Sequence, residues 1–243
     1  YVLFDKQNDW AEVDVVESAQ TYLNSLIQSG ELIVPNGVSY TFAGSYENQI
    51  RVSKKLAVVL PLALAIIFLI LYFQFKRVST TIIVFSGVFV AWSGGFVMLW
   101  LYGQDWFFNF NLFGENIRNL FQMHPVNLSV AVWVGFLALF GIATDDGVII
   151  STYLDQTFED RKPNSIKAVR EAVIHAGKRR IRPAMMTVAT TILALIPVLM
   201  STGRGADVMV PMAIPSFGGM VFAILTTFVV PIIYSIIREK ELK

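Results

Sequence analysis

Two adjacent aspartates, Asp145 and Asp146, lie in an otherwise uncharged and largely apolar stretch that runs from residue 126 to residue 154. That stretch is long enough to cross a bilayer, which takes about 20 predominantly apolar residues in a helix. An ionisable side chain at bilayer depth costs at least ~2.5–3.5 kcal/mol, so such residues usually line an ion or proton path or face a protein interior. The pair therefore constrains both the fold and the function of this chain.

The composition also indicates a membrane protein. Apolar residues make up 55% of the 243 residues and charged residues only 15%, which is low for a water-soluble domain. We predict an α-helical membrane protein whose transmembrane domain covers residues 54–243. Its five expected spans lie near residues 56–75, 78–102, 126–154, 184–202 and 208–237.

Basic residues predict the orientation of the spans, because Lys and Arg are enriched in cytoplasmic loops. The turn at residues 76–77, the loop at 155–183 and the tail after residue 237 carry two, eight and three basic residues. The two opposite loops carry one each, Arg118 and Arg204. We therefore expect the tail and the 155–183 loop in the cytoplasm and residues 1–53 outside. The net charge of +1 gives no indication of a nucleic-acid partner.

Residues 1–53 read as a small β-α-β piece. Residues 1–5 resemble a strand, residues 13–27 have apolar side chains at helical spacing, and apolar residues alternate over 38–42. A unit of this size buries too little surface to be more than marginally stable by itself. We expect it to complete a larger sheet, and the chain to begin inside a folded unit.

Two loops have marked patterns. The outer loop, residues 103–125, is rich in aromatic residues, which suit either a segment in the headgroup region or a loop packed over the bundle. The cytoplasmic loop, residues 155–183, has apolar residues at helical spacing from Ile166 to Ala176, followed by Gly177 as an expected stop. We predict a short amphipathic helix there, with its basic residues at the headgroups.

The aspartates are the first candidates for chemistry. They are about 100° apart around a helix, so only one of them can face the bundle interior. A proton carrier needs a carboxyl group that gains and loses a proton, and a bilayer interior favours the neutral form. Alternatively, hydroxyl or backbone groups satisfy both carboxyls, which then tie helices together.

Neighbouring spans supply further candidates. Thr187, Thr190 and Thr191 recur at helical spacing and could relay a proton, although such hydroxyls also bond simply to their own backbone. Glycine pairs at 94–95 and 218–219 allow close helix approach, and the prolines of the last two spans permit kinks.

Methionine thioethers are ligands for soft ions such as Cu(I). Six methionines fall in or beside the last two spans, although packing is the commoner use of this residue. They are Met185, Met186, Met200, Met209, Met212 and Met220. The chain has no cysteine, and the predicted topology puts His124 and His175 on opposite sides of the membrane, so they cannot share a metal ion.

Several motifs together resemble the C-terminal end of a resistance-nodulation-division (RND) transporter of the heavy-metal efflux branch. Residues 1–5 and 42–44 are similar to closing strands of its periplasmic porter domain, and the likeness covers nearly the whole chain. The other matching elements are GIATDDG at 141–147, RPAMMT at 182–187, PVLMSTGRGADVM at 197–209 and FGGM at 217–220.

The resemblance implies a proton-driven exporter of heavy-metal cations, of the copper/silver or the zinc/cobalt/cadmium type, and not an enzyme. The five spans correspond to the second half of a helix bundle, so the chain would be a piece carrying part of a proton relay. Asp145 occupies the place of a relay glutamate and is expected to face the bundle interior near the threonines, and Met209 falls where a methionine of the metal path stands.

The resemblance also implies partners and a location. These are a homotrimer in the bacterial inner membrane, membrane lipid, the remainder of the pump polypeptide, a periplasmic adaptor and an outer-membrane channel. No cofactor is expected beyond the transported metal ion and protons.

Two features depart from the family's pattern. Ala184 stands where copper and silver exporters carry a relay lysine, so the relay differs or the substrate is divalent. The 103–125 loop is longer than usual for the family.

Three other functions were considered. An intramembrane aspartyl protease needs its two carboxylates on separate helices, which this sequence disfavours. An RND exporter of drugs or amphiphiles, and a non-catalytic membrane assembly subunit, both remain open; the latter predicts that Asp145 can be replaced without loss.

Overall fold

The computed structural model describes residues 12–35, 37–43, 45–112 and 114–241. The chain divides into two compact units, Tyr1–Val58 and Val59–Lys243, and each is described by itself. The dividing point lies within one long helix, α2 (Ser45–Phe75).

In the first unit, α1 (Glu12–Ser29) confirms the helix predicted over residues 13–27. The Tyr40 hydroxyl donates to the Asn24 side-chain oxygen at 2.7 Å, which holds the following segment against α1. Residues 38–43 form no strand in this structure, and the strand expected at residues 1–5 lies outside the described residues. A strand needs a neighbour to take its N–H and C=O groups, and the described part of this unit offers none.

The second unit confirms the five predicted spans. Five helices in the described residues are long and apolar enough to cross a membrane. They are α2, α3 (Val78–Tyr102), α5 (Val130–Arg161), α6 (Ile166–Leu199) and α7 (Ala206–Glu241). Only residues 76 and 77 separate α2 from α3, as expected for a tight turn, and Lys76 has a positive φ of 52°.

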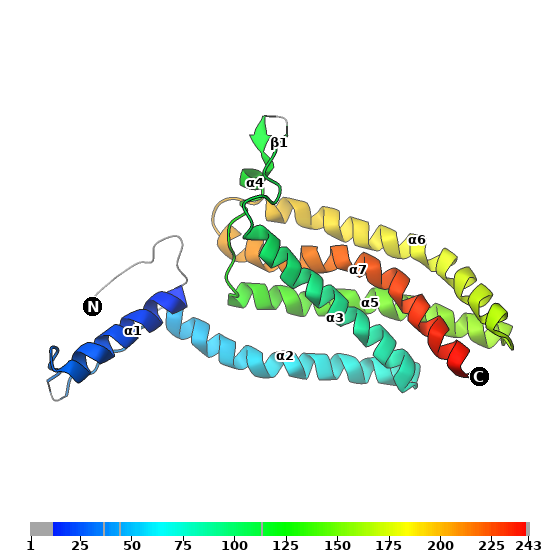
Figure 1. The fold of residues 1–243 in the computed structure, drawn as a ribbon, viewed down its shortest axis with the longest axis horizontal. Coiled ribbons are helices and arrows are strands. Elements are labelled where there is room, and N and C mark those ends of the chain that lie inside the picture. Colours follow the sequence, from blue (N-terminus) through cyan, green and yellow to red (C-terminus); the bar gives the residue numbers. More distant parts are fainter. Residues whose placement is uncertain (1–11, 36, 44, 113, 242–243) are drawn as a thin grey trace. The chain divides into compact units, whose positions relative to one another are not determined.

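The core lies where α3, α5 and α7 meet (Figure 1). Its largest fully buried side chains include Phe136 and Phe140 from α5 and Ile214 and Met220 from α7. Trp92 of α3 makes edge-to-face contacts with both phenylalanines, with ring centroids 6.5 and 6.0 Å apart. Burial of these aromatic rings holds the three helices together.

Glycines set the separation of these helices. A side chain at Gly218 would have its Cβ 2.6 Å from the Gly94 carbonyl oxygen, and a Cβ at Gly135 would overlap the Met212 carbonyl. Ser216 of α7 donates to the Gly135 carbonyl at 3.1 Å. Thus α7 packs backbone to backbone against both α3 and α5, as the predicted glycine pairs suggested.

Helix α6 differs from the prediction. The expected short amphipathic helix and the fourth span are one continuous helix, and neither Gly177 nor Pro183 ends it. A helical glycine costs only about 1 kcal/mol relative to alanine. Packing offsets that cost, because Val169, Ala172, Val173 and Ala176 are all buried. The three prolines of α7 likewise lie within one continuous helix.

The outer loop folds into a small hairpin. Strands β1 (Asn111–Leu112) and β2 (Glu115–Asn116) pair antiparallel, and α4 (Ile117–Leu120) follows directly. In Figure 1 this hairpin stands out to the side of the bundle, beside the ends of α6 and α7. Phe107, Phe121 and Met123 pack against the core, whereas Trp106, Phe108 and Phe110 are exposed.

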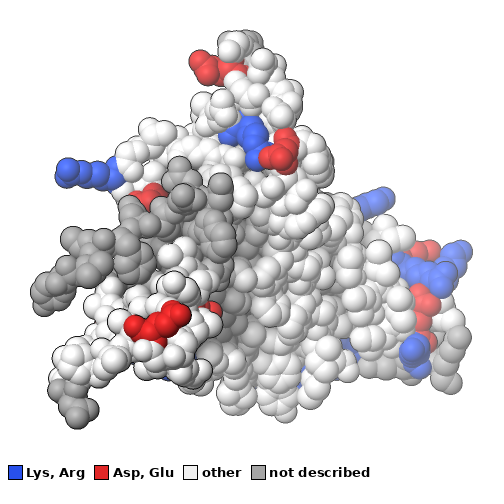
Figure 2. Space-filling model, turned by 60° about the vertical axis from the view of Figure 1, so that its left-hand side comes forward, with Lys and Arg blue, Asp and Glu red and all other residues white. Residues whose placement is uncertain are grey.

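Charge is distributed as a membrane protein requires. Figure 2 shows a broad band with few charged residues over the bundle, and basic and acidic side chains gathered together at one end. Such a band matches the hydrocarbon layer of a bilayer.

Candidate proton-carrying site

The structure places the two aspartates on different sides of α5. Asp146 is buried, with 3% of its surface exposed, whereas Asp145 is exposed. The expectation that Asp145 faces the interior of this bundle is therefore wrong for the five helices described: Asp146 does.

The rotation of α5 follows from its apolar face. Phe136, Leu139, Ala143 and Ile150 are buried and lie on the same side of the helix as Asp146. At the next residue, a Cβ on Gly147 would be 3.0 Å from the Val84 side chain, so α3 passes close to this turn. Packing of the large apolar residues thus brings Asp146 inside.

Buried oxygen atoms near Asp146 lack partners. Among the described residues, Asp146 Oδ2, Ser151 Oγ and Thr152 Oγ1 are buried without a hydrogen bond. Native proteins rarely leave such atoms unpaired, so each calls for water or a further protein group. Together they make the C-terminal half of α5 unusually polar.

The opposite face of α5 carries mostly small side chains, and no other described helix covers it. Ala138, Gly141, Asp145 and Ile149 are exposed at helical spacing. A carboxylate exposed to lipid is costly, and small residues favour close contact with another helix. This face is therefore built to meet protein rather than lipid.

The threonines lie on a similar uncovered face of α6. Thr187 and Thr190 are exposed, whereas Ala184 and Val188 are buried. The Thr187 hydroxyl donates to the Pro183 carbonyl at 3.2 Å, and the Thr191 hydroxyl donates to the Thr187 carbonyl at 2.9 Å. The Thr190 hydroxyl lies within hydrogen-bond distance of the Met186 and Thr187 carbonyls of the same helix. Among the described residues, no hydrogen bond joins these threonines to either aspartate.

No metal centre is preformed in the described part of the chain: it has no group of three His, Asp or Glu residues that could hold an ion. Met209 is exposed in the first turns of α7, whereas Met220 is fully buried as a packing residue. Met209 is therefore open to a ligand.

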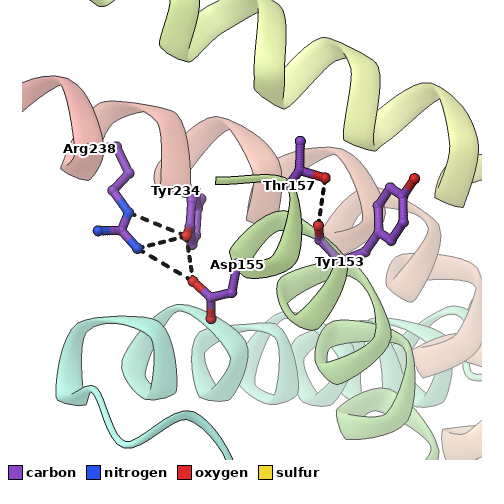
Figure 3. Close-up of polar contacts among 5 residues, drawn as sticks. All are labelled: Tyr153, Asp155, Thr157, Tyr234 and Arg238. Carbon is purple, nitrogen blue, oxygen red and sulfur yellow. Dashed lines mark hydrogen bonds and ion pairs between the residues drawn. The ribbon is translucent and has the colours of Figure 1, made fainter. Parts of the chain in front are cut away.

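At the end of the bundle that carries the end of α7, a polar cluster joins α5 to α7 (Figure 3). The Tyr234 hydroxyl donates to Asp155 at 2.5 Å, and the Arg238 guanidinium donates to that hydroxyl at 2.9 Å and lies 3.4 Å from Asp155. Tyr234 is almost fully buried. This cluster was not predicted from the sequence, although a Tyr and an Arg four residues apart at the end of a span are a usable signal.

A second contact joins α6 to α7. The Arg170 guanidinium donates two hydrogen bonds to Glu239, at 2.7 and 3.1 Å. It lies near the surface, with 65% of the Arg170 side chain exposed. The C-terminal ends of α5 and α7 and the N-terminal end of α6 are thereby tied to one another.

Comparison with known proteins agrees with this geometry. The sequence pattern of the AcrB/AcrD/AcrF family matches residues 11–110 and 120–238. The chain is 33% identical over 237 residues to the cation efflux system protein CusA of Escherichia coli (strain K12), covering 92% of this chain and 20% of that protein. It is 28% identical over 216 residues to the cobalt-zinc-cadmium resistance protein CzcA of Cupriavidus metallidurans, covering 88% and 18%.

A solved structure is similar as well. The crystal structure of a heavy metal efflux pump, crystal form II, matches with a TM-score of 0.63 and 29% identity, over 90% of this chain and 19% of the other. The chain thus spans about a fifth of the length of the relatives it matches. In those relatives, the segment that matches this chain is a small part of a much longer protein.

Proposed function

The chain belongs to the AcrB/AcrD/AcrF family, with heavy-metal RND efflux transporters as relatives, and we propose that it forms part of a pump that exports metal cations in exchange for protons. The observation that carries the proposal is a pair of carboxyl groups in mid-span, one inside the bundle and one on a face shaped to meet protein. Structural roles alone would not require an acid on each side of one helix turn.

Asp145 is the proposed site of proton exchange. It stands on the small-residue face of α5 that the remainder of the pump covers, where a carboxyl group can be reached from a second set of helices. Asp146 is the second candidate, because its buried Oδ2 has no partner among the described residues. Gaining and losing a proton changes the cost of burying such a group, and this change can bias helices between two arrangements.

Thr187, Thr190 and Thr191 are proposed as the polar lining next to this site. Their hydroxyls donate to backbone carbonyls of α6. The lone pairs of the hydroxyl oxygens can therefore accept a hydrogen bond from a group that meets this uncovered face. Met209 is proposed as a transient contact for the metal, since its thioether is exposed and soft sulfur ligands select Zn as well as Cu(I).

The metal is proposed from two features. The relatives' names include cobalt, zinc and cadmium as well as a cation efflux system. Ala184, where copper and silver exporters carry a lysine, is buried among the bundle residues, so this bundle has no cation at that position. This favours a divalent cargo over Cu(I) or Ag(I).

We further propose the setting of the intact pump: a homotrimer in the bacterial inner membrane, with a periplasmic portion that meets an adaptor and an outer-membrane channel. The nearly uncharged band of Figure 2 supports the membrane, and the basic residues of the 155–183 loop and of the tail support its orientation.

Transport by the intact pump in lipid vesicles tests the function. With a proton gradient imposed, we expect Zn²⁺ or Co²⁺ to move against its own gradient, and a protonophore to stop that movement. Cu(I) and a hydrophobic dye are the comparison cargoes. Movement of the dye alone would make this a drug exporter, and metal movement that ignores the protonophore would refute proton exchange.

A further inference from the structure

The segment just before strand β1 carries three aromatic rings that nothing in the described chain covers. Trp106 is 66% exposed, Phe108 44% and Phe110 50%. Phe108 and Phe110 stack with ring centroids 6.0 Å apart, so they present one continuous apolar surface. Aromatic rings held out in this way are unusual unless they meet a partner.

Several contacts hold these rings in place. Arg118 donates to the Gln104 carbonyl and lies 3.3 Å from Asp105, which closes the base of the loop. The Ile117 N–H donates to the Phe110 carbonyl at 3.1 Å, and the Asn116 side chain donates to Asn109 at 3.1 Å. The hairpin is thus a fixed arm.

The arm is also tied to the bundle at a fixed depth. Phe107, the residue between two exposed rings, packs against the core. Gln122, just after α4, donates to the Ser201 carbonyl in the loop between α6 and α7. The exposed rings therefore stand level with the outer ends of the spans.

The direction of the arm identifies its partner. In Figure 1 it extends across the direction of the helices rather than beyond their ends, so it runs alongside the membrane surface. Trp100, near the outer end of α3, is a further aromatic residue on this side of the bundle and is 59% exposed. Trp and Tyr favour the headgroup level of a bilayer, where one side of the ring is apolar and the other is wet.

The three rings lie within the part of the chain that the family pattern matches. The pattern matches residues up to 110 and again from 120, so only the two strands of the hairpin fall between the matched parts. We infer that this loop is a lipid-binding arm, whose rings Trp106, Phe108 and Phe110 lie among the headgroups and upper acyl chains of the outer leaflet.

Photocrosslinking in membranes tests this inference in the intact pump. The probe, p-benzoylphenylalanine, replaces Phe108 or Phe110 in separate variants, and mass spectrometry identifies what is captured. We expect phospholipid at both positions. Phe107 is the matched control: it adjoins Phe108 but packs inward, so the probe there is expected to capture this chain.

Capture of an adaptor, a neighbouring protomer or another protein by the Phe108 and Phe110 probes would overturn the inference, and so would the absence of any adduct. A second measurement uses the emission of Trp106, taken as the difference between the pump and its Trp106→Phe variant. We expect lipids brominated near the headgroup to quench that emission and aqueous iodide to leave it. Quenching by iodide alone would contradict a lipid site. Neither result depends on transport, so the two proposals fail separately.

Discussion

At the scale of single residues, glycine decides how closely the helices approach. Gly94 and Gly218 face each other across α3 and α7, and a Cβ on Gly94 would stand 2.8 Å from the Gly218 carbonyl oxygen. Because that oxygen belongs to a helix backbone, it cannot move aside as a flexible side chain could.

We therefore expect Gly218→Ala to destabilise the protein. Overpacking of a tight contact costs about 1–3 kcal/mol. Gly177→Ala is the control, because its added Cβ would be an ordinary 3.7 Å from Ile181. Thermal unfolding of the purified pump measures both variants, and an equal or smaller loss for Gly218→Ala would show that the contact is not tight.

The aspartates show what residue-level reasoning could and could not establish. Their number, their depth and the angle between them followed from the sequence, because helix geometry is fixed. Which one faces inward depended on how the residues Phe136 to Ile150 pack against α3 and α7, which is a tertiary property. Placing Asp145 inside on the strength of family position was therefore an error for this bundle.

At the scale of helices and strands, contacts between neighbours override local signals. Gly177 and Pro183 are ordinary helix-ending residues, yet α6 continues through both because its buried face packs along α5 and α7. At residues 38–42 the opposite occurs: the alternation of apolar and polar residues predicts a strand, but no strand forms because none of the described residues pairs with it. The length of each apolar run predicted that a span exists, but it did not predict where the helix begins and ends.

The buried polar cluster between α5 and α7 should stabilise the protein more than the exposed contact between α6 and α7. Tyr234→Phe removes the hydroxyl that Asp155 and Arg238 share. A hydrogen bond to a charged group contributes about 1.5–3 kcal/mol, so we expect a clear fall in the unfolding midpoint. Arg170→Gln, which breaks the more exposed contact to Glu239, should lower it less. Equal shifts would show that burial of the cluster adds nothing.

At the scale of the whole molecule, the charge asymmetry predicts which loops share a side. The sequence has no cysteine, so a single cysteine can report each loop. In an otherwise cysteine-free pump, we expect Glu115→Cys to react with an impermeant maleimide added outside the cell, and Lys162→Cys to react only after the membrane is opened. Outside labelling of both positions would contradict the orientation.

The uncovered faces of α5 and α6 explain why much of the site could not be predicted. Asp145 and Thr187 are exposed on the five helices described, on faces that we propose meet the remainder of the pump. Under that proposal their partners are residues of another segment, and no pattern within these 243 residues encodes them. The overall architecture was predictable because hydropathy alone determines the number of spans.

Proton flux through the intact pump carrying Asp145→Asn tests the central claim most directly. Asparagine keeps the volume and much of the hydrogen bonding of aspartate but cannot exchange a proton near neutral pH. Asp160→Asn is the control, because Asp160 is exposed beyond the apolar part of the same helix. In vesicles with a metal gradient, we expect metal-driven proton flux to fall to background for Asp145→Asn, with trimer assembly and the control unchanged. Flux equal to that of the unmodified pump would contradict the account.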